Sequence, residues 1–193
     1  MARAYLYVLP LHGEDWLKVG VSNDPLRRAR EFARRWYAVF DLGQAMLVEA
    51  EGMADARALE RDIRARFAAH RAPMPLHITE AAGGATEWYR GALPVLADYA
   101  RHCANAGHPI HMPARGWFAA ALERELPLLH DWACAVLRDV DCDAEDAMGL
   151  RLRLPATHAA LLRDAIDAHA SCGLDPAPYL PCAVSAWHAG LVV

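Results

Sequence analysis

The sequence predicts an α/β protein of the α+β type, in which a small three-stranded, mainly antiparallel sheet is flanked by helices and followed by a mostly helical accessory region. Three observations lead to this prediction. Short segments in the first half are rich in aromatic and β-branched residues, which favour strands. Longer segments place apolar residues at spacings of three and four, which is typical of helices. Hydrophobic residues make up 55% and charged residues 23% of the 193 residues, so the chain can bury a core.

Three segments are expected to form the sheet. Residues Ala4–Leu9 read AYLYVL, a good strand sequence. The turn-like segment PLHGED separates them from Trp16–Val21, which alternate well enough to form a second strand. A third strand is expected at Gln44–Ala50. The first two strands should therefore lie side by side as an antiparallel hairpin.

Three helices are expected in the same half. The first should cover Pro25–Trp36, because Asp24 is a suitable N-cap and a proline suits the first helical position. The others are expected at Ala54–His70 and Leu93–Ala104, where apolar residues recur with helical spacing. These helices supply the apolar faces that would cover the sheet.

The sequence changes character near residue 105, where we place the boundary between a first domain, 1–104, and a mostly helical accessory region, 105–193. In the accessory region a helical segment is expected at Arg115–Val140, with a break near Pro127. A further helix is expected at Thr157–Ser171.

Before that last helix, residues Leu150–Leu154 read LRLRL and alternate as in a strand. This order is similar to the opening of ribbon-helix-helix DNA-binding proteins, in which Arg151 and Arg153 would face a major groove. Three prolines follow the helix: Pro176, Pro178 and Pro181. Because proline disfavours a helix interior, they argue against the second helix of that motif.

The formal net charge of −4 is unevenly distributed. Residues 1–95 contain thirteen Lys and Arg against twelve Asp and Glu, and residues 96–193 contain seven against twelve. A nucleic-acid partner would therefore have to bind a local basic surface. The acidic second half favours a scaffold or a surface for a protein partner.

The composition also bears on location and on the cysteines. No run of about 18 apolar residues is present, and the N-terminus lacks the pattern of a signal peptide, so we expect a cytoplasmic protein with no membrane partner. The five cysteines are scattered and form no C-x-x-C pair: Cys103, Cys134, Cys142, Cys172 and Cys182. This spacing argues against a disulfide framework and favours free thiols.

An ordered set of short motifs runs through the first half. It consists of Tyr5-Leu6-Tyr7, Lys18-Val19-Gly20, Arg28 eight residues after Gly20, and Glu60 in the next long helix. The set resembles the GIY-YIG nuclease superfamily over about residues 3–92. The Lys-Val-Gly motif and the later Glu87-Trp88-Tyr89 are most similar to a branch found in phage, bacterial and fungal meiotically up-regulated proteins.

The resemblance implies metal-dependent hydrolysis of DNA phosphodiester bonds, with Mg²⁺ or Mn²⁺ as cofactor and DNA as partner. Glu60 would hold the metal, since Mg²⁺ prefers oxygen ligands and keeps several waters. Arg28 would clamp the phosphate with its planar fork of donors. Tyr7 and Lys18 would handle the attacking water, provided that nearby positive charge lowers the pKa of Tyr7.

Further contacts to phosphate or DNA are expected from Gly20, Ser22 and Arg27, together with Arg28. Gly20 is expected to let the chain leave the strand tightly and a ligand approach the backbone. The amides at the start of the helix at Pro25 would add a weak anion site.

Plainer interpretations remain open at these positions. Arg28 taken alone is an ordinary solvated helix arginine, and Glu60 has Arg64 four residues later as a surface partner. Lys18 stands where the family has a tyrosine. It would contact phosphate, or act as a base if burial lowers its pKa, or mark a protein that has lost cleavage.

Three functions therefore remain open. The first is an endonuclease. The second is a cleavage-deficient DNA-binding module, which salt-dependent DNA affinity without turnover would select. The third is a protein-interaction domain without a nucleic-acid partner, which failure to bind DNA at low salt would favour.

Overall fold

The computed structural model describes residues 3–76, 78, 87–139, 152 and 154–190. The chain divides into two compact units, Met1–Phe118 and Ala119–Val193. The boundary expected near residue 105 falls inside the first unit, because Ile110–His111 pair with a central strand of its sheet.

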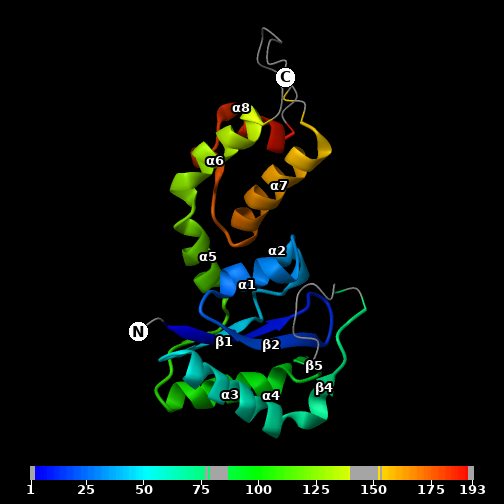
Figure 1. Ribbon diagram of the computed structural model, residues 1–193, viewed down its shortest axis with the longest axis vertical. Coiled ribbons are helices and arrows are strands. Elements are labelled where there is room, and N and C mark those ends of the chain that lie inside the picture. Colours follow the sequence, from blue (N-terminus) through cyan, green and yellow to red (C-terminus); the bar gives the residue numbers. More distant parts are fainter. Residues whose placement is uncertain (1–2, 77, 79–86, 140–151, 153, 191–193) are drawn as a thin grey trace. The chain divides into compact units, whose positions relative to one another are not determined.

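The first unit is built around a six-stranded sheet with the order β4-β5-β2-β1-β3-β6, in which every neighbouring pair is antiparallel (Figure 1). The strands are β1 Ala4–Pro10, β2 Trp16–Ser22, β3 Met46–Ala50, β4 Arg71–Ala72, β5 Trp88–Arg90 and β6 Ile110–His111. The α+β class is confirmed and the count of three strands is wrong. The three predicted strands form the adjoining trio β2-β1-β3, and the three added strands have only two or three residues, too few for alternation to show.

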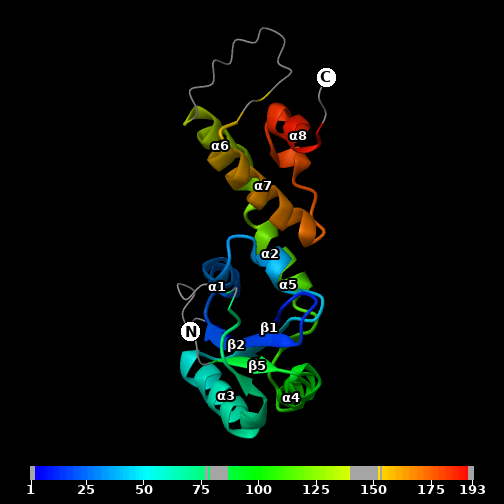
Figure 2. The same ribbon diagram turned by 90° about the vertical axis from the view of Figure 1, so that its right-hand side faces the viewer.

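Helices cover both faces of this sheet. The elements are α1 Pro25–Phe32, α2 Trp36–Val39, α3 Met53–Arg66, the 3-10 helix η1 Ala68–His70, α4 Leu93–Asn105, and α5 Arg115–Glu123, which continues into the second unit. Helices α1 and α2 lie on one face, and α3 and α4 lie on the other (Figure 1 and Figure 2). The single helix expected at Pro25–Trp36 is wrong, because Ala33 has extended dihedral angles and ends α1.

The face under α3 and α4 carries the main aliphatic core. Alternate residues of the central strands point to this face, as the two-residue period of a strand requires: Leu6, Val8, Leu17, Val19, Met46 and Val48. They pack against Ile63 of α3 and Leu96 of α4, both of which are buried. The other residues of the same strands are thereby directed to the face that α1 covers.

The face under α1 is largely aromatic. The ring of Phe32 in α1 lies 6.2 Å from the ring of Tyr7 in β1 and 5.8 Å from the ring of Phe40, measured between centroids. Trp36 of α2 lies 5.2 Å from Phe118 in the same way. All five of these side chains are buried, so the aromatic packing fixes α1 on the sheet.

The second unit contains helices packed around a small apolar core. They are α6 Leu126–Arg138, α7 Ala156–Ser171, the 3-10 helix η3 Ala177–Tyr179 and α8 Cys182–His188. The break expected near Pro127 is confirmed, since α5 ends at Glu123 and α6 begins one residue before that proline. Helix α8 begins directly after Pro181, where a proline does not disturb helical hydrogen bonds.

Two expectations involve residues that lie partly outside the described ranges. The predicted strand at 150–154, with Arg151 and Arg153, lies outside the described residues except for Leu152 and Leu154, which pack against the core of the second unit. Four cysteines are free thiols: Cys103, Cys134, Cys172 and Cys182. Cys142 lies outside the described residues.

Within the described ranges, none of the helices is long and apolar enough to cross a membrane.

Candidate functional site

Tyr7 and Gly20 form a tight cross-strand pair at the centre of the sheet. They are direct partners in the β1–β2 ladder. A Cβ atom on Gly20 would lie 2.3 Å from Tyr7 Oη and 2.6 Å from Tyr7 Cζ. The phenol ring therefore lies across β2 in the space that glycine leaves. The expected role of Gly20, a tight exit from the strand with room for a ligand, is wrong, because Gly20 is inside β2 and Tyr7 fills that room.

The hydroxyl group of Tyr7 is neutral in this environment. Its side chain is only 2% exposed, and burial raises the pKa of Tyr7 to about 12, although the guanidinium of Arg28, which donates a hydrogen bond to the hydroxyl, opposes the rise. The expectation that positive charge lowers this pKa is wrong, since desolvation outweighs one cation. Tyr7 is thus suited to orient a water or phosphate oxygen by hydrogen bonding, and poorly suited to remove a proton at neutral pH.

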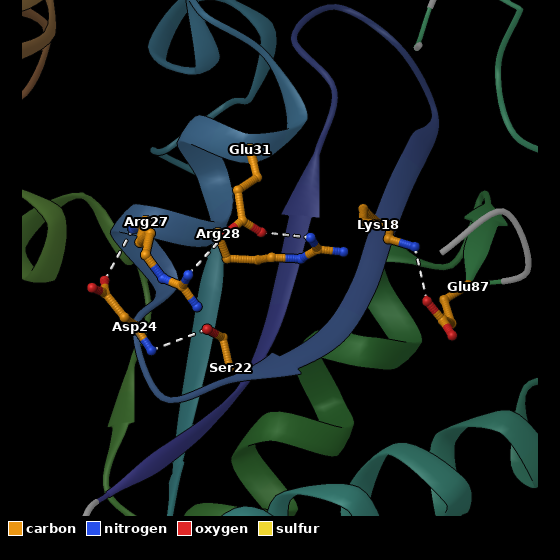
Figure 3. A network of polar contacts seen from close by, with 7 residues as sticks. All are labelled: Lys18, Ser22, Asp24, Arg27, Arg28, Glu31 and Glu87. Carbon is orange, nitrogen blue, oxygen red and sulfur yellow. Dashed lines mark hydrogen bonds and ion pairs between the residues drawn. The ribbon is translucent and has the colours of Figure 1, made fainter. Parts of the chain in front are cut away.

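Arg28 reaches over the aromatic packing from α1. Its guanidinium carbon lies 4.4 Å from the centroid of the Phe32 ring, and its Nη1 donates to Glu31 Oε2 at 2.7 Å (Figure 3). Burial opposes the charge, yet hydrogen bonds to Glu31 and Tyr7 raise the pKa of Arg28. Because 26% of the side chain is exposed, Arg28 is a cation that is held by Glu31 and is partly open to solvent.

Lys18 is fully buried on β2. Its Nζ donates to Glu87 Oε2 at 3.0 Å and lies 5.7 Å and 5.5 Å from the ring centroids of Phe32 and Trp88. Burial lowers the pKa of Lys18, while the hydrogen bond and charge of Glu87 oppose the change. Figure 3 shows Arg28 and Glu87 on either side of Lys18.

Glu87 connects this arrangement to α3. Its Oε1 lies 3.4 Å from Arg64 Nη2, so the same carboxylate pairs with a lysine on the sheet and an arginine on the helix. Glu60 precedes Arg64 by one helical turn. Burial and then the charge of Glu87 raise the pKa of Glu60, against the opposing charges of Arg64 and Lys18.

The charges of Arg28 and Glu60, which come from opposite faces of the sheet, both reach Tyr7 and Lys18 and influence their protonation. Strand β5 pairs with Trp16–Lys18 of β2, and α3 reaches this border, where Arg64 meets Glu87. The site is therefore centred on the border between β2 and β5.

The residues around the start of α1 are engaged within the chain. The backbone N–H of Asp24 donates to Ser22 Oγ at 3.0 Å, and Asp24 Oδ1 accepts from the backbone N–H of Arg27 at 3.0 Å (Figure 3). The Asp24 carboxylate therefore already accepts one of the backbone N–H groups that an anion at the start of the helix would use. The side chain of Arg27 is 73% exposed and pairs with Glu31 Oε1 at 3.3 Å.

Sequence reasoning did not assign two of these partners. Glu31 holds both Arg27 and Arg28, and the spacings of four and three residues on one helix are the signal that indicates such pairs. The sequence leaves open whether Glu87 supports the site or is structural. Its contact with Lys18 joins residues 69 positions apart, which no local pattern reveals.

The chemistry of Glu60 fits a metal that keeps most of its waters. Among the described residues there is no group of three or more His, Cys, Asp and Glu side chains that could hold a metal ion. Glu60 is a half-buried carboxylate whose charge is disfavoured by burial and by Glu87, and a bound cation would relieve both effects. Mg²⁺ or Mn²⁺ is compatible with one such ligand because water can fill the other positions.

A comparison with models of known protein families finds one match. The family model described as the T5orf172 domain matches residues 4–123, more than half of the chain. Families of this kind are associated with nucleases and with nucleic acids. No curated protein and no solved structure matches the chain.

Proposed function

We propose that this chain, which belongs to the T5orf172 domain family, is a metal-dependent endonuclease of the GIY-YIG type that hydrolyses DNA phosphodiester bonds. The observation that carries the proposal is that Tyr7, Lys18 and Arg28 lie around the ring of Phe32, at 6.2 Å, 5.7 Å and 4.4 Å from its centroid. The charge of Glu60 also reaches Tyr7 and Lys18. These residues were expected to act together from their order in the sequence. A nuclease needs this combination of a carboxylate, a phosphate clamp and a group that orients water.

Glu60 would hold the divalent metal in this scheme. A bound Mg²⁺ or Mn²⁺ supplies charge neutralisation at the phosphate and a more acidic water. Tyr7 stays neutral, so its hydroxyl orients the attacking water or a phosphate oxygen. Arg28 and Lys18 supply fixed positive charge for the additional negative charge that develops on the phosphate.

A plasmid-nicking assay tests this function. Supercoiled plasmid is incubated with the full chain and Mg²⁺ or Mn²⁺, with EDTA as the metal-free control. We expect conversion to open-circular DNA that EDTA stops and that Glu60→Gln reduces by at least about 100-fold, the size of effect typical for a group that acts directly on charge in the transition state. Glu51→Gln is the matched control, because Glu51 is an exposed glutamate outside the grouping.

Two outcomes contradict the proposal. One is the absence of nicking with either metal. The other is nicking that Glu60→Gln and Glu51→Gln leave equally intact, since Glu60 would then have no part in the reaction.

A cleavage-deficient DNA-binding module is the second candidate. It is favoured by the neutral Tyr7 and by the ion pair that holds Lys18, because neither group is free to take a proton from water. This function predicts DNA affinity that falls with salt, without turnover. Arg28→Ala should then weaken binding to all sequences and reduce the salt slope by about one. Binding that salt does not change would exclude this candidate.

A further inference from the structure

The composition of the basic residues is unusual. The chain has 20 Lys and Arg residues, of which Lys18 is the single lysine, so the other 19 are arginines. This lysine is fully buried in a central strand. An ammonium ion in such a place is costly unless a partner and hydrogen bonds compensate for its lost hydration. The surroundings of Lys18 therefore have to account for its charge.

Glu87 is fixed beside Lys18 by the backbone as well as by its side chain. The N–H of Val19, the residue after Lys18, donates to the carbonyl oxygen of Glu87 at 3.0 Å. Trp88, the residue after Glu87, is the ladder partner of Lys18. With the backbone held at both neighbouring residues, the carboxylate lies 3.0 Å from the ammonium.

The other oxygen of Glu87 is held by Arg64 at 3.4 Å. An arginine keeps its charge at any pH at which the protein is folded, so it favours the ionised form of the carboxylate next to it. Arg64 comes from α3, on the opposite face of the sheet from α1. The pair of Lys18 and Glu87 is thus secured from the helix that also carries Glu60.

Two aromatic rings complete the surroundings. Phe32 and Trp88 lie 5.7 Å and 5.5 Å from the Lys18 nitrogen, within the range of cation–π attraction. The compact ammonium group of this lysine differs from the planar guanidinium that the other 19 basic residues carry.

We propose that Glu87, held by Arg64, is a positioning residue that keeps Lys18 as a buried ammonium ion, so that a phosphate bound by Arg28 is also stabilised by the fixed positive charge of Lys18 beneath the surface. The inference rests on the proposed function for the phosphate and goes beyond it in assigning Glu87 and the charge of Lys18. Two further charged groups act on Lys18: Arg28 from α1 disfavours its charge, and Glu60 from α3 favours it.

The sign of the effect of Glu87 follows from these contacts. Burial and Arg28 both favour the neutral amine, and Glu87 is the strongest group that opposes them. Without the negative charge of Glu87, Lys18 would lose its proton at a lower pH. If Lys18 serves as a cation, activity then declines at a lower pH on the alkaline side. If Lys18 served as a base, losing its proton earlier would increase activity instead.

The single lysine allows a direct test in the full chain. With ¹³C- and ¹⁵N-labelled lysine, one side-chain Cε and Nζ signal reports the protonation of Lys18 across a pH titration. We expect the midpoint to move to lower pH in Glu87→Gln. Glu31→Gln should leave the midpoint in place, because that carboxylate pairs with Arg27 and Arg28 and not with Lys18.

Glu87→Asp is a second variant, which keeps the test decisive if Glu87→Gln does not fold. It keeps the charge with a shorter reach, so we expect a midpoint between those of the wild type and Glu87→Gln. Circular dichroism and thermal unfolding establish that each variant is folded. An unchanged midpoint in folded Glu87→Gln, or an equal shift in Glu31→Gln, would overturn the proposal.

The pH dependence of plasmid nicking supplies the functional half of the test. The alkaline decline of the nicking rate should move to lower pH in Glu87→Gln, in parallel with the Lys18 midpoint, and Glu87→Asp should recover part of the shift. A rate that increases as Lys18 loses its proton would overturn the assignment as a cation. If the wild type does not nick DNA, the proposed function fails, while the titration still decides whether Glu87 keeps Lys18 charged.

Discussion

Replacing Gly20 with alanine tests the close packing of Tyr7 on β2. Gly20→Ala places a Cβ atom 2.3 Å from Tyr7 Oη and 2.6 Å from Tyr7 Cζ. Ordinary contacts of this kind are about 3.5–4.0 Å long, so the ring has to move by more than about 1 Å. The ring is buried against Phe32, which limits where it can move.

The expected cost is that of an overpacked core, about 1–3 kcal/mol in the free energy of unfolding. For a chain of 193 residues, about 2 kcal/mol corresponds to a decrease in Tm of roughly 4–8 °C. The displaced hydroxyl also loses its contact with Arg28, so any nicking activity or DNA affinity should decrease with stability.

Thermal unfolding followed by circular dichroism measures the change in stability. Gly116→Ala is the matched control, because a Cβ there meets no atom within 4 Å and the residue lies in helix α5, where alanine is favoured over glycine. A double-mutant cycle with Tyr7→Leu isolates the clash. If Gly20→Ala is as stable as Gly116→Ala, or costs as much in the Tyr7→Leu background, the account of Gly20 is refuted.

Three further predictions concern neighbouring groups. Phe32→Ala should destabilise the chain by about 3–5 kcal/mol in urea unfolding, since Phe32 packs between Tyr7 and Phe40; a loss below about 1 kcal/mol would contradict its place in the core. Because its folded pKa of about 12 exceeds the ordinary value of 10.0, Tyr7 contributes stability that is complete below pH 10 and is lost as the pH rises through 12. Tyr7→Phe should therefore lose stability less steeply than the wild type between pH 10 and 12, and equal slopes in alkaline unfolding curves would disprove this. Glu31→Gln should strengthen DNA binding several-fold at low salt, because it releases Arg27 and Arg28, and weaker binding in a filter or anisotropy assay would argue against phosphate contact there.

The long strands and the start of α1 could be predicted from the sequence because their signals are local. Aromatic and β-branched residues mark β1, alternation marks β2, and Asp24 with Pro25 marks the first turn of the helix. The end of that helix could not be predicted, since Ala33 is neither glycine nor proline and leaves the helical conformation without a sequence signal. Strands of two or three residues likewise have no measurable period.

The candidate site could also be predicted only in part from the sequence. The order of the motifs agrees with two placements in the fold, since the strand register puts Tyr7 beside Gly20 and the next helix carries Arg28. The depth of burial could not be predicted, and it decides the chemistry. It makes Tyr7 a neutral group and makes Lys18 depend on Glu87, a residue 69 positions away.

The central claim is that Glu60 holds a divalent metal in the same site as Lys18. Paramagnetic Mn²⁺ broadens nearby NMR signals, and the single lysine makes the Lys18 Cε signal an unambiguous reporter. We predict that Mn²⁺ broadens this signal in the wild type and in Glu51→Gln, and that Glu60→Gln abolishes the effect. A Lys18 signal that stays sharp at saturating Mn²⁺, or that broadens equally in Glu60→Gln, would contradict the account.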